Sequence, residues 1–253
     1  MAKANALQLV QQVLYNLGDA QITTLNGITG AALAAFQAVN EGIYEIAFES
    51  LFQPLETSTF FTIATGVTTY SKPSTIFAYD RDSFRYNEGQ QNFKYKAHRW
   101  VDNKYPCQTN TNVPMVVYDW QGNFNVYPIP PVSENGYLVK YRGWVIPTPF
   151  GIGAPTNTAT DTLTCWLPEG FDIGLLTDWA TKKVLQYRHN PETQSYHIKI
   201  FGEERNDGQG DQGNLSRLKN LYNSHTIEDG NIMVEPMEQR EGGWFIQESP
   251  ITP

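Results

Sequence analysis

The 253-residue chain has few of the residues on which several protein classes depend. It contains two cysteines, Cys107 and Cys165, which excludes a disulfide framework, and no Cys-x-x-Cys or Cys/His spacing predicts a zinc site. We expect two free thiols, buried or half-buried. The four histidines are scattered; His189 and His197 are separated by a proline rather than placed on one helix face. This pattern is typical of surface or capping histidines.

Long hydrophobic runs are also missing. No stretch approaches the roughly 18 consecutive apolar residues of a transmembrane helix. The N-terminal segment lacks the unbroken apolar core of a signal peptide. We therefore expect no contact with a membrane and assembly in a cytoplasm.

Charged residues make up only 17% of the chain, and the net charge is −8. A protein that neutralises DNA phosphates needs a basic face, so this balance argues against one that grips DNA. The sequence lacks the G-x-S-x-G, P-loop, G-x-G-x-x-G and H-E-x-x-H motifs. Asp80 and Asp82 flank Arg81 and should point to one face of a strand, as an interface charge cluster or a solvated face. We predict no enzymatic activity, no cofactor and no metal.

Apolar residues, which are 40% of the chain, follow a helical period at both ends of the sequence. Residues 5–17 form one such stretch, which should end at a Gly18 cap, and residues 31–52 form the clearest one. The period returns after Pro168, with Leu175, Trp179 and Leu185 on the buried side, and again over residues 215–222. Neither pair of helices can bury its apolar stripe alone, so helices from both ends should pack together.

Between these helices the period changes to two. Residues 57–147 contain short β-branched and aromatic stretches separated by turns. The clearest is a hairpin whose strands cover 115–120 and 124–127, joined at Gln121-Gly122. Residues 91–103 predict a further strand. Together these strands indicate a compact antiparallel β region.

Residues 226–253 have no clear period and are broken by prolines and glycines. They carry isolated apolar residues, which we expect to anchor a terminal arm on a partner. These candidate anchors are Ile232, Met233, Val234, Trp244, Phe245 and Ile246.

The sequence thus predicts an α+β fold. The N- and C-terminal helices form a helical bundle, an antiparallel β-barrel or sandwich domain is inserted, and an extended C-terminal arm follows. The expected boundaries are 1–56 and 149–225 for the two parts of the helical domain, 57–148 for the β domain and 226–253 for the arm.

Several segments, in this order, resemble the head-to-tail connector adaptors of tailed bacteriophages, particularly the tail tubular protein A and tail accessory factor class of short-tailed phages. They begin with a short helix ending "NLGD" and the long helix "ALAAFQAVNEGIYEIAFESLF". The β segments "TGVTTYSKPSTIFAYDRDSF", "VPMVVYDWQGNFNVYPIPP" and "GYLVKYRGWVIP" follow, and then "DTLTCWLPEGFDIGLLTDWATKKVL". The resemblance covers most of the chain, although the glycine-rich break at 207–213 departs from it.

The resemblance implies a structural virion protein at the head-tail junction of a phage particle. Its copies would form a homo-oligomeric ring, a dodecamer, between the portal protein and the tail nozzle or tube. DNA would pass through the central channel without sequence-specific binding. The C-terminal arm, with its six anchors, would be the segment that binds the portal.

Three other interpretations stay open. A nozzle, stopper or tail-completion protein would share β modules and ring symmetry. A carbohydrate-binding β module could use Trp100, Trp120, Tyr118 and Tyr127 as a sugar platform, although core and interface packing is the better explanation of these aromatics. A peptidoglycan hydrolase would need a catalytic carboxylate in a cleft, and no residue stands out for that role.

Overall fold

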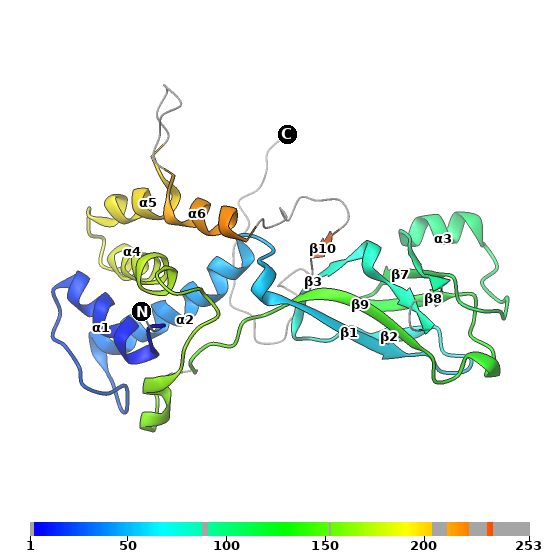
Figure 1. Ribbon diagram of the computed structural model, residues 1–253, viewed down its shortest axis with the longest axis horizontal. Coiled ribbons are helices and arrows are strands. Elements are labelled where there is room, and N and C mark those ends of the chain that lie inside the picture. Colours follow the sequence, from blue (N-terminus) through cyan, green and yellow to red (C-terminus); the bar gives the residue numbers. More distant parts are fainter. Residues whose placement is uncertain (1–2, 88–90, 152, 204–211, 223–231, 235–253) are drawn as a thin grey trace. The chain divides into compact units, whose positions relative to one another are not determined.

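The computed structural model describes residues 3–87, 91–151, 153–203, 212–222 and 232–234. The chain divides into two compact units. The helical unit comprises Met1–Leu55 and Ile146–Thr226, and the β unit comprises Glu56–Val145 and Ile227–Pro253. This mixture of helices and sheets confirms the predicted α+β class (Figure 1).

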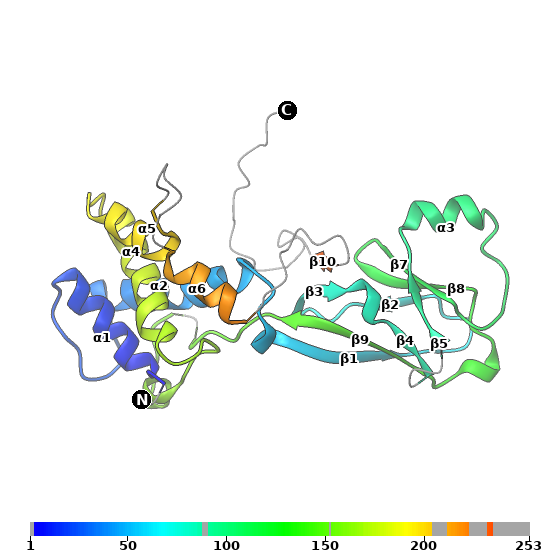
Figure 2. The ribbon, with the colours of Figure 1, turned by 45° about the horizontal axis from the view of Figure 1, so that its top comes forward.

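The helical unit is built from helices that come from both ends of the sequence, and their apolar faces form one hydrophobic core (Figure 2). Leu175, Trp179 and Leu185 are buried, as predicted. The helices are α1 (Ala6–Leu17), α2 (Gly30–Phe48), α4 (Thr177–Tyr187), α5 (Thr193–Phe201) and α6 (Asn214–Leu221), with shorter turns at η1 (Gln53–Leu55), η5 (Thr158–Thr162) and the π-helical η6 (Asp172–Leu176).

Helix α1 begins and ends where its sequence provides caps. The backbone N–H of Gln8 donates to Asn5 Oδ1 at 2.9 Å, and the backbone N–H of Asn5 donates to Gln8 Oε1 at 3.0 Å. This reciprocal pair is a capping box. Gly18 ends the helix with a φ of 70°, a left-handed conformation that glycine adopts without strain, which confirms the predicted cap.

Helix α2 ends at Phe48, earlier than the predicted residue 52. Polar side chains join it to α4. Trp179 Nε1 donates to Glu45 Oε2 at 2.6 Å, and Lys183 contacts both Glu45 and Glu41. A Cβ at position 42 would come within 2.8 Å of a Leu176 methyl group. Because residue 42 is a glycine, η6 can pack closely against α2.

A buried carboxylate ties the start of the chain to the entry of α4. Asp172 is 1% exposed, and its Oδ2 accepts from the backbone N–H of Ala4 at 2.7 Å. Its Oδ1 accepts from Gly170 and Ile173 at 2.9 and 2.8 Å. These three donors offset the cost of burying the carboxylate, so the segment before α1 is held against the segment before α4.

The larger sheet of the β unit is centred on β9. Strand β1 pairs along one edge of β9, while β3 and β4 pair one after the other along the opposite edge, and β10 adds outside β3. Its strands are β1 (Glu56–Thr62), β3 (Ile76–Asp80), β4 (Arg85–Tyr86), β5 (Gln91–Asn92), β9 (Leu138–Val145) and β10 (Ile232–Val234), with the short helix η2 (Arg81–Ser83) between β3 and β4.

The smaller sheet has the order β2-β8-β7-β6. Strands β7 and β8 form the predicted hairpin, and Gln121 and Gly122 at its turn have φ values of 52° and 72°. Two consecutive positive φ values are typical of a type I′ turn, whose twist matches that of the strands. The strands are β2 (Thr69–Ser71), β6 (Lys94–Tyr95), β7 (Val116–Trp120) and β8 (Asn123–Tyr127), and the short helix η4 (Val132–Glu134) follows.

The two sheets share a core that is rich in aromatic side chains. Phe124 is fully buried, and its ring centroid lies 5.1 to 5.9 Å from those of four other rings, Phe61, Tyr79, Phe84 and Tyr141. The described strands form two open sheets rather than a closed barrel, so the barrel alternative is wrong. The sheets meet through side chains and not through a continuous backbone ladder.

A helix replaces most of the strand predicted over residues 91–103. Only 91–92 and 94–95 pair in the sheets, and α3 (His98–Lys104) follows them. The helix lies beside β7 and β8 in both views (Figures 1 and 2). Its buried Val101 belongs to a second small core with Val116, Tyr118 and Tyr127. The smaller sheet is therefore covered on both faces, which explains why successive residues of β7 are buried.

Candidate interaction surfaces

The predicted arm anchors fall into two groups. Trp244, Phe245 and Ile246 lie outside the described residues. The backbone of Ile232, Met233 and Val234 forms strand β10, which the sequence pattern did not predict. The portal-binding role of all six residues remains a prediction.

Strand β10 pairs antiparallel with β3, in a register that sets Ile232 opposite Asp80 and Val234 opposite Ala78. An unpaired strand edge presents backbone donors and acceptors to other chains. Strand β10 occupies this edge of β3 with a segment from the C-terminal part of the chain. The arm is thus attached to the β unit through backbone pairing at residues 232–234.

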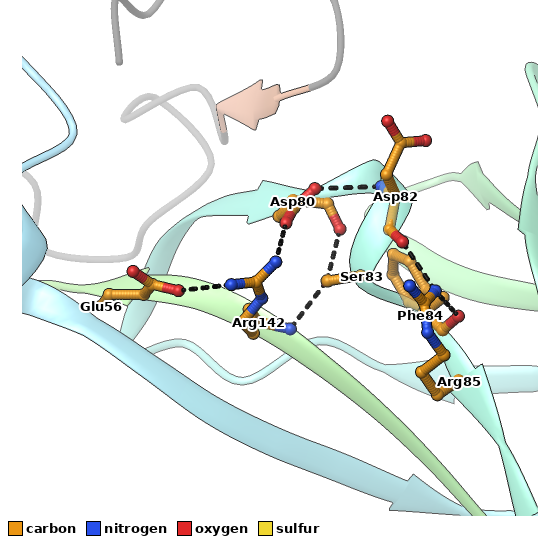
Figure 3. Close-up of polar contacts among 7 residues, drawn as sticks. All are labelled: Glu56, Asp80, Asp82, Ser83, Phe84, Arg85 and Arg142. Atoms are coloured by element: carbon orange, nitrogen blue, oxygen red, sulfur yellow. Dashed lines mark hydrogen bonds and ion pairs between the residues drawn. The ribbon is translucent and has the colours of Figure 1, made fainter. Parts of the chain in front are cut away.

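A cluster of charged residues lies at the same end of β3 (Figure 3). The guanidinium of Arg142 on β9 contacts Glu56 on β1 at 3.2 Å and Asp80 on β3 at 3.1 Å. Its side chain is 57% exposed, so each ion pair contributes at most about 1 kcal/mol to stability. The cluster joins three strands of the larger sheet where β10 is added.

Further hydrogen bonds in Figure 3 join Asp80, Asp82, Ser83, Arg85 and Arg142. Asp80 Oδ1 accepts from the backbone N–H of Asp82 at 3.0 Å and so caps η2. The Ser83 hydroxyl accepts from the backbone N–H of Arg142 at 2.8 Å, and Arg85 donates to the backbone carbonyl of Asp82 at 2.7 Å. Asp80, which the sequence suggested as part of an interface charge cluster or a solvated face, holds the local structure together.

A more strongly charged surface surrounds α3, and we call it the α3 surface. The Nζ atoms of Lys96 and Lys104 lie 5.3 and 4.8 Å from the ring centre of Trp100, within the range of cation–π attraction. Trp120, at the end of β7, is 47% exposed. The residues of this surface are Lys94, Lys96, Arg99, Trp100, Lys104 and Trp120.

His98 and Asp102 contact side chains of the α3 surface and of the loop that follows α3. The His98 ring stacks on Trp120 with centroids 3.7 Å apart and an interplanar angle of 11°. His98 Nδ1 lies 3.1 Å from Asp102 Oδ2, one helical turn further on. Asp102 also accepts from Gln108 at 2.9 Å, so its carboxylate already has two partners.

The proposed sugar platform does not form as one exposed surface. Tyr118 and Tyr127 are 6% and 3% exposed and lie in the small core with Val101. Burial, together with the nearby Asp102, raises the pKa of Tyr118. Trp100 and Trp120 remain accessible, but they belong to the cationic α3 surface. Packing thus accounts for the two tyrosines.

The two cysteines differ in exposure. Cys165 is buried, and burial raises the pKa of its thiol. Cys107 is exposed in the loop that follows α3, so the prediction that both thiols are buried or half-buried is wrong for this residue. The loop between α3 and β7 has no regular sheet pairing to cover the side chain.

A hollow between α4, α5 and α6 bears on the hydrolase interpretation. It is lined by Asp178, whose pKa is raised by burial, and by Lys199 and Arg217. Asp178 is the single carboxylate among the lining residues, whereas glycoside hydrolysis ordinarily uses a pair.

Over the described part of the chain, no cluster of three His, Cys, Asp or Glu side chains is arranged to hold a metal ion. None of the described helices is long and apolar enough to span a bilayer.

The helical unit exposes large aromatic side chains. Tyr15 on α1 is 73% exposed and Tyr187 on α4 is 69% exposed. An ion pair between Arg188 and Asp19, at 2.6 Å, joins the ends of these two helices. Exposed tyrosines combine apolar area with a hydrogen-bonding hydroxyl, and both features favour contact with another protein.

Comparison with known families gives a match over most of the chain. A family model described as "SU10 adaptor protein" matches residues 4–218. This range includes parts of both the helical and the β unit. No curated protein matches the chain.

Proposed function

The chain belongs to the SU10 adaptor protein family, a family of phage head-tail adaptors, and from this premise we propose that it forms a ring between the portal and the tail of the virion. The family places the chain among phage structural proteins and implies association with portal and tail proteins. The match over residues 4–218 is the observation that carries the proposal, because it includes residues of both units. The ring is a dodecamer with a central DNA channel.

The contacts between neighbouring copies are assigned to the helical unit. Three of its helices expose large apolar side chains, namely Tyr15 on α1, Tyr187 on α4 and Leu221 on α6. Burying such side chains against a neighbour contributes about 1.5–3 kcal/mol for each, and every copy in a ring makes the same contact twice. These residues therefore support lateral assembly.

The portal contact is assigned to the C-terminal arm. Strand β10 attaches the arm to the β unit, and the segment after it carries the apolar anchors Trp244, Phe245 and Ile246. A ring of identical arms binds with high avidity even when each contact is weak. The net charge of −8 supports passage of DNA on the condition that acidic side chains line the channel, because acidic walls do not hold phosphates.

Native mass measurement tests the ring. The chain is measured alone and after mixing with the portal protein of the same phage. We expect a portal complex that carries twelve copies, because each portal subunit presents one site for an arm. A copy number that does not match the symmetry of the portal ring, or no complex at all, would contradict the proposal. Binding to a nozzle ring in place of the portal would favour a different tail-ring role.

A further inference from the structure

The α3 surface concentrates positive charge on an acidic protein. Residues 94–104 contain four lysines and arginines and one aspartate, whereas the whole chain has a net charge of −8. Among the described residues, none of Lys94, Lys96, Arg99 and Lys104 forms an ion pair. Positive charges this close together repel one another. Binding of an anionic group to the surface therefore lowers its electrostatic free energy.

The acidic side chains next to this surface do not neutralise it. Asp102 supplies one negative charge against four positive ones, and its carboxylate contacts His98 and Gln108 rather than any of the four cations. Asp119, on the neighbouring strand β7, pairs with Lys72 at 2.6 Å. The anionic group must therefore come from outside these residues.

The C-terminal segment of the same chain has the complementary chemistry. Residues 235–253 contain four glutamates and one arginine, and they include the apolar run Trp244-Phe245-Ile246. The glutamates match the lysines and arginine of the α3 surface. The apolar run matches Trp100 and the half-exposed Trp120. An acidic segment with aromatic residues is the kind of partner that cations flanking a tryptophan bind well.

The attachment of this segment favours binding within one chain. Strand β10 ends at Val234, paired with Ala78, and belongs to the same unit as α3. Nineteen residues follow Val234, and they can span about 60 Å when extended. A domain of about 100 residues has a radius of gyration of only about 13 Å, so the segment is long enough to reach α3. A tether of this length gives an effective concentration on the order of millimolar.

We propose that, in the isolated chain, residues 235–253 bind to the α3 surface of the same molecule. The contact goes beyond the adaptor role, because it concerns the chain before assembly. It holds Trp244 and Phe245 on the β unit, and the portal then competes with the α3 surface for the same anchors. The arm is thereby kept from binding other partners until the portal is present.

Disulfide trapping in the full-length chain tests this contact. Cys107, exposed just after α3, is the natural probe, while the buried Cys165 stays inert. A second cysteine is introduced in the segment at one position at a time, by Gln239→Cys, Gly242→Cys or Ser249→Cys. Under mild oxidation we expect an intramolecular disulfide with Cys107 from at least one position.

The charge dependence of trapping separates the proposed contact from random collision. Arg99→Glu combined with Lys104→Glu should slow trapping at least tenfold. The control combines Lys140→Glu with Arg217→Glu, which reverses two exposed charges elsewhere, and should leave the rate within twofold. In the chain that carries the introduced cysteine but no charge reversal, salt at about 0.5 M should slow trapping, because it screens exposed charges.

Three results would overturn the proposal. The first is equal trapping in the two charge variants. The second is a disulfide that forms mainly between two chains, which would assign the surface to a second copy. The third is trapping that is insensitive to charge while a single-stranded DNA probe binds the α3 surface and loses binding in the Arg99→Glu/Lys104→Glu variant. None of these experiments includes the portal protein. A negative result would therefore contradict the binding of residues 235–253 to the α3 surface without testing the proposed ring.

Discussion

Replacing Phe124 by alanine is expected to destabilise the β unit by about 3–5 kcal/mol, the range for removing a large buried aromatic side chain. Phe124 is fully buried and lies against rings from both sheets, among them Tyr79 on β3 and Tyr141 on β9. The cavity left by the substitution would lie where the two sheets meet. Thermal or denaturant unfolding, followed by near-UV circular dichroism of the aromatic residues, measures the loss.

Phe60→Ala is the matched control for this substitution. Phe60 lies on β1 and is 56% exposed, next to the inward-facing Phe61. Removing its ring should change the free energy of unfolding by less than about 1 kcal/mol, since little buried area is lost. Equal effects of the two substitutions would contradict the placement of the core between the sheets.

Removing residues 235–253 is expected to weaken portal binding at least hundredfold while the remaining chain stays folded. The double variant Trp244→Ala/Phe245→Ala should have most of this effect. Two buried aromatic side chains contribute about 1.5–3 kcal/mol each, and the loss is multiplied over all arms in a ring. Surface plasmon resonance with immobilised portal rings measures the affinity.

Gln247→Ala is the control within the same segment, because it shortens a polar side chain and leaves the apolar run intact. It should bind the portal like the unmodified chain. Full portal affinity in the truncated chain would show that the portal contact lies elsewhere on the molecule. Loss of affinity with Gln247→Ala alone would show that the apolar anchors are not its main determinants.

The features that the sequence predicted well depend on local signals. The period of three to four residues over positions 5–17, together with the glycine at position 18, locates α1 closely. The Gln121-Gly122 turn between alternating stretches does the same for the β7–β8 hairpin. In each case the residues that set the conformation lie within a few positions of one another, so no knowledge of the tertiary structure is needed.

The features that were missed depend on contacts between distant residues. Helix α3 spans seven residues and buries a single apolar side chain, Val101, too few to give a helical period. It is stabilised by packing on Val116 and Tyr127. Strand β10 has three residues and pairs with β3, more than 150 positions earlier in the chain. Short elements of this kind owe their stability to tertiary packing rather than to propensity.

The sequence pattern also could not distinguish a closed barrel from two open sheets. Alternating burial, as in β9, requires only that one face of the strand is covered. A barrel and a pair of stacked sheets both satisfy that condition.

The candidate α3 surface had a signal that could have been used, namely the basic run at residues 94–104 in an acidic chain. The strand predicted there obscured it.

Single-particle cryo-electron microscopy of the chain mixed with its portal protein tests the central claim most directly. The account predicts a ring of twelve copies on one face of the portal, coaxial with it and open along the axis for DNA. Particles in which the chain has no rotational order, or in which it binds away from the portal axis, would contradict the account.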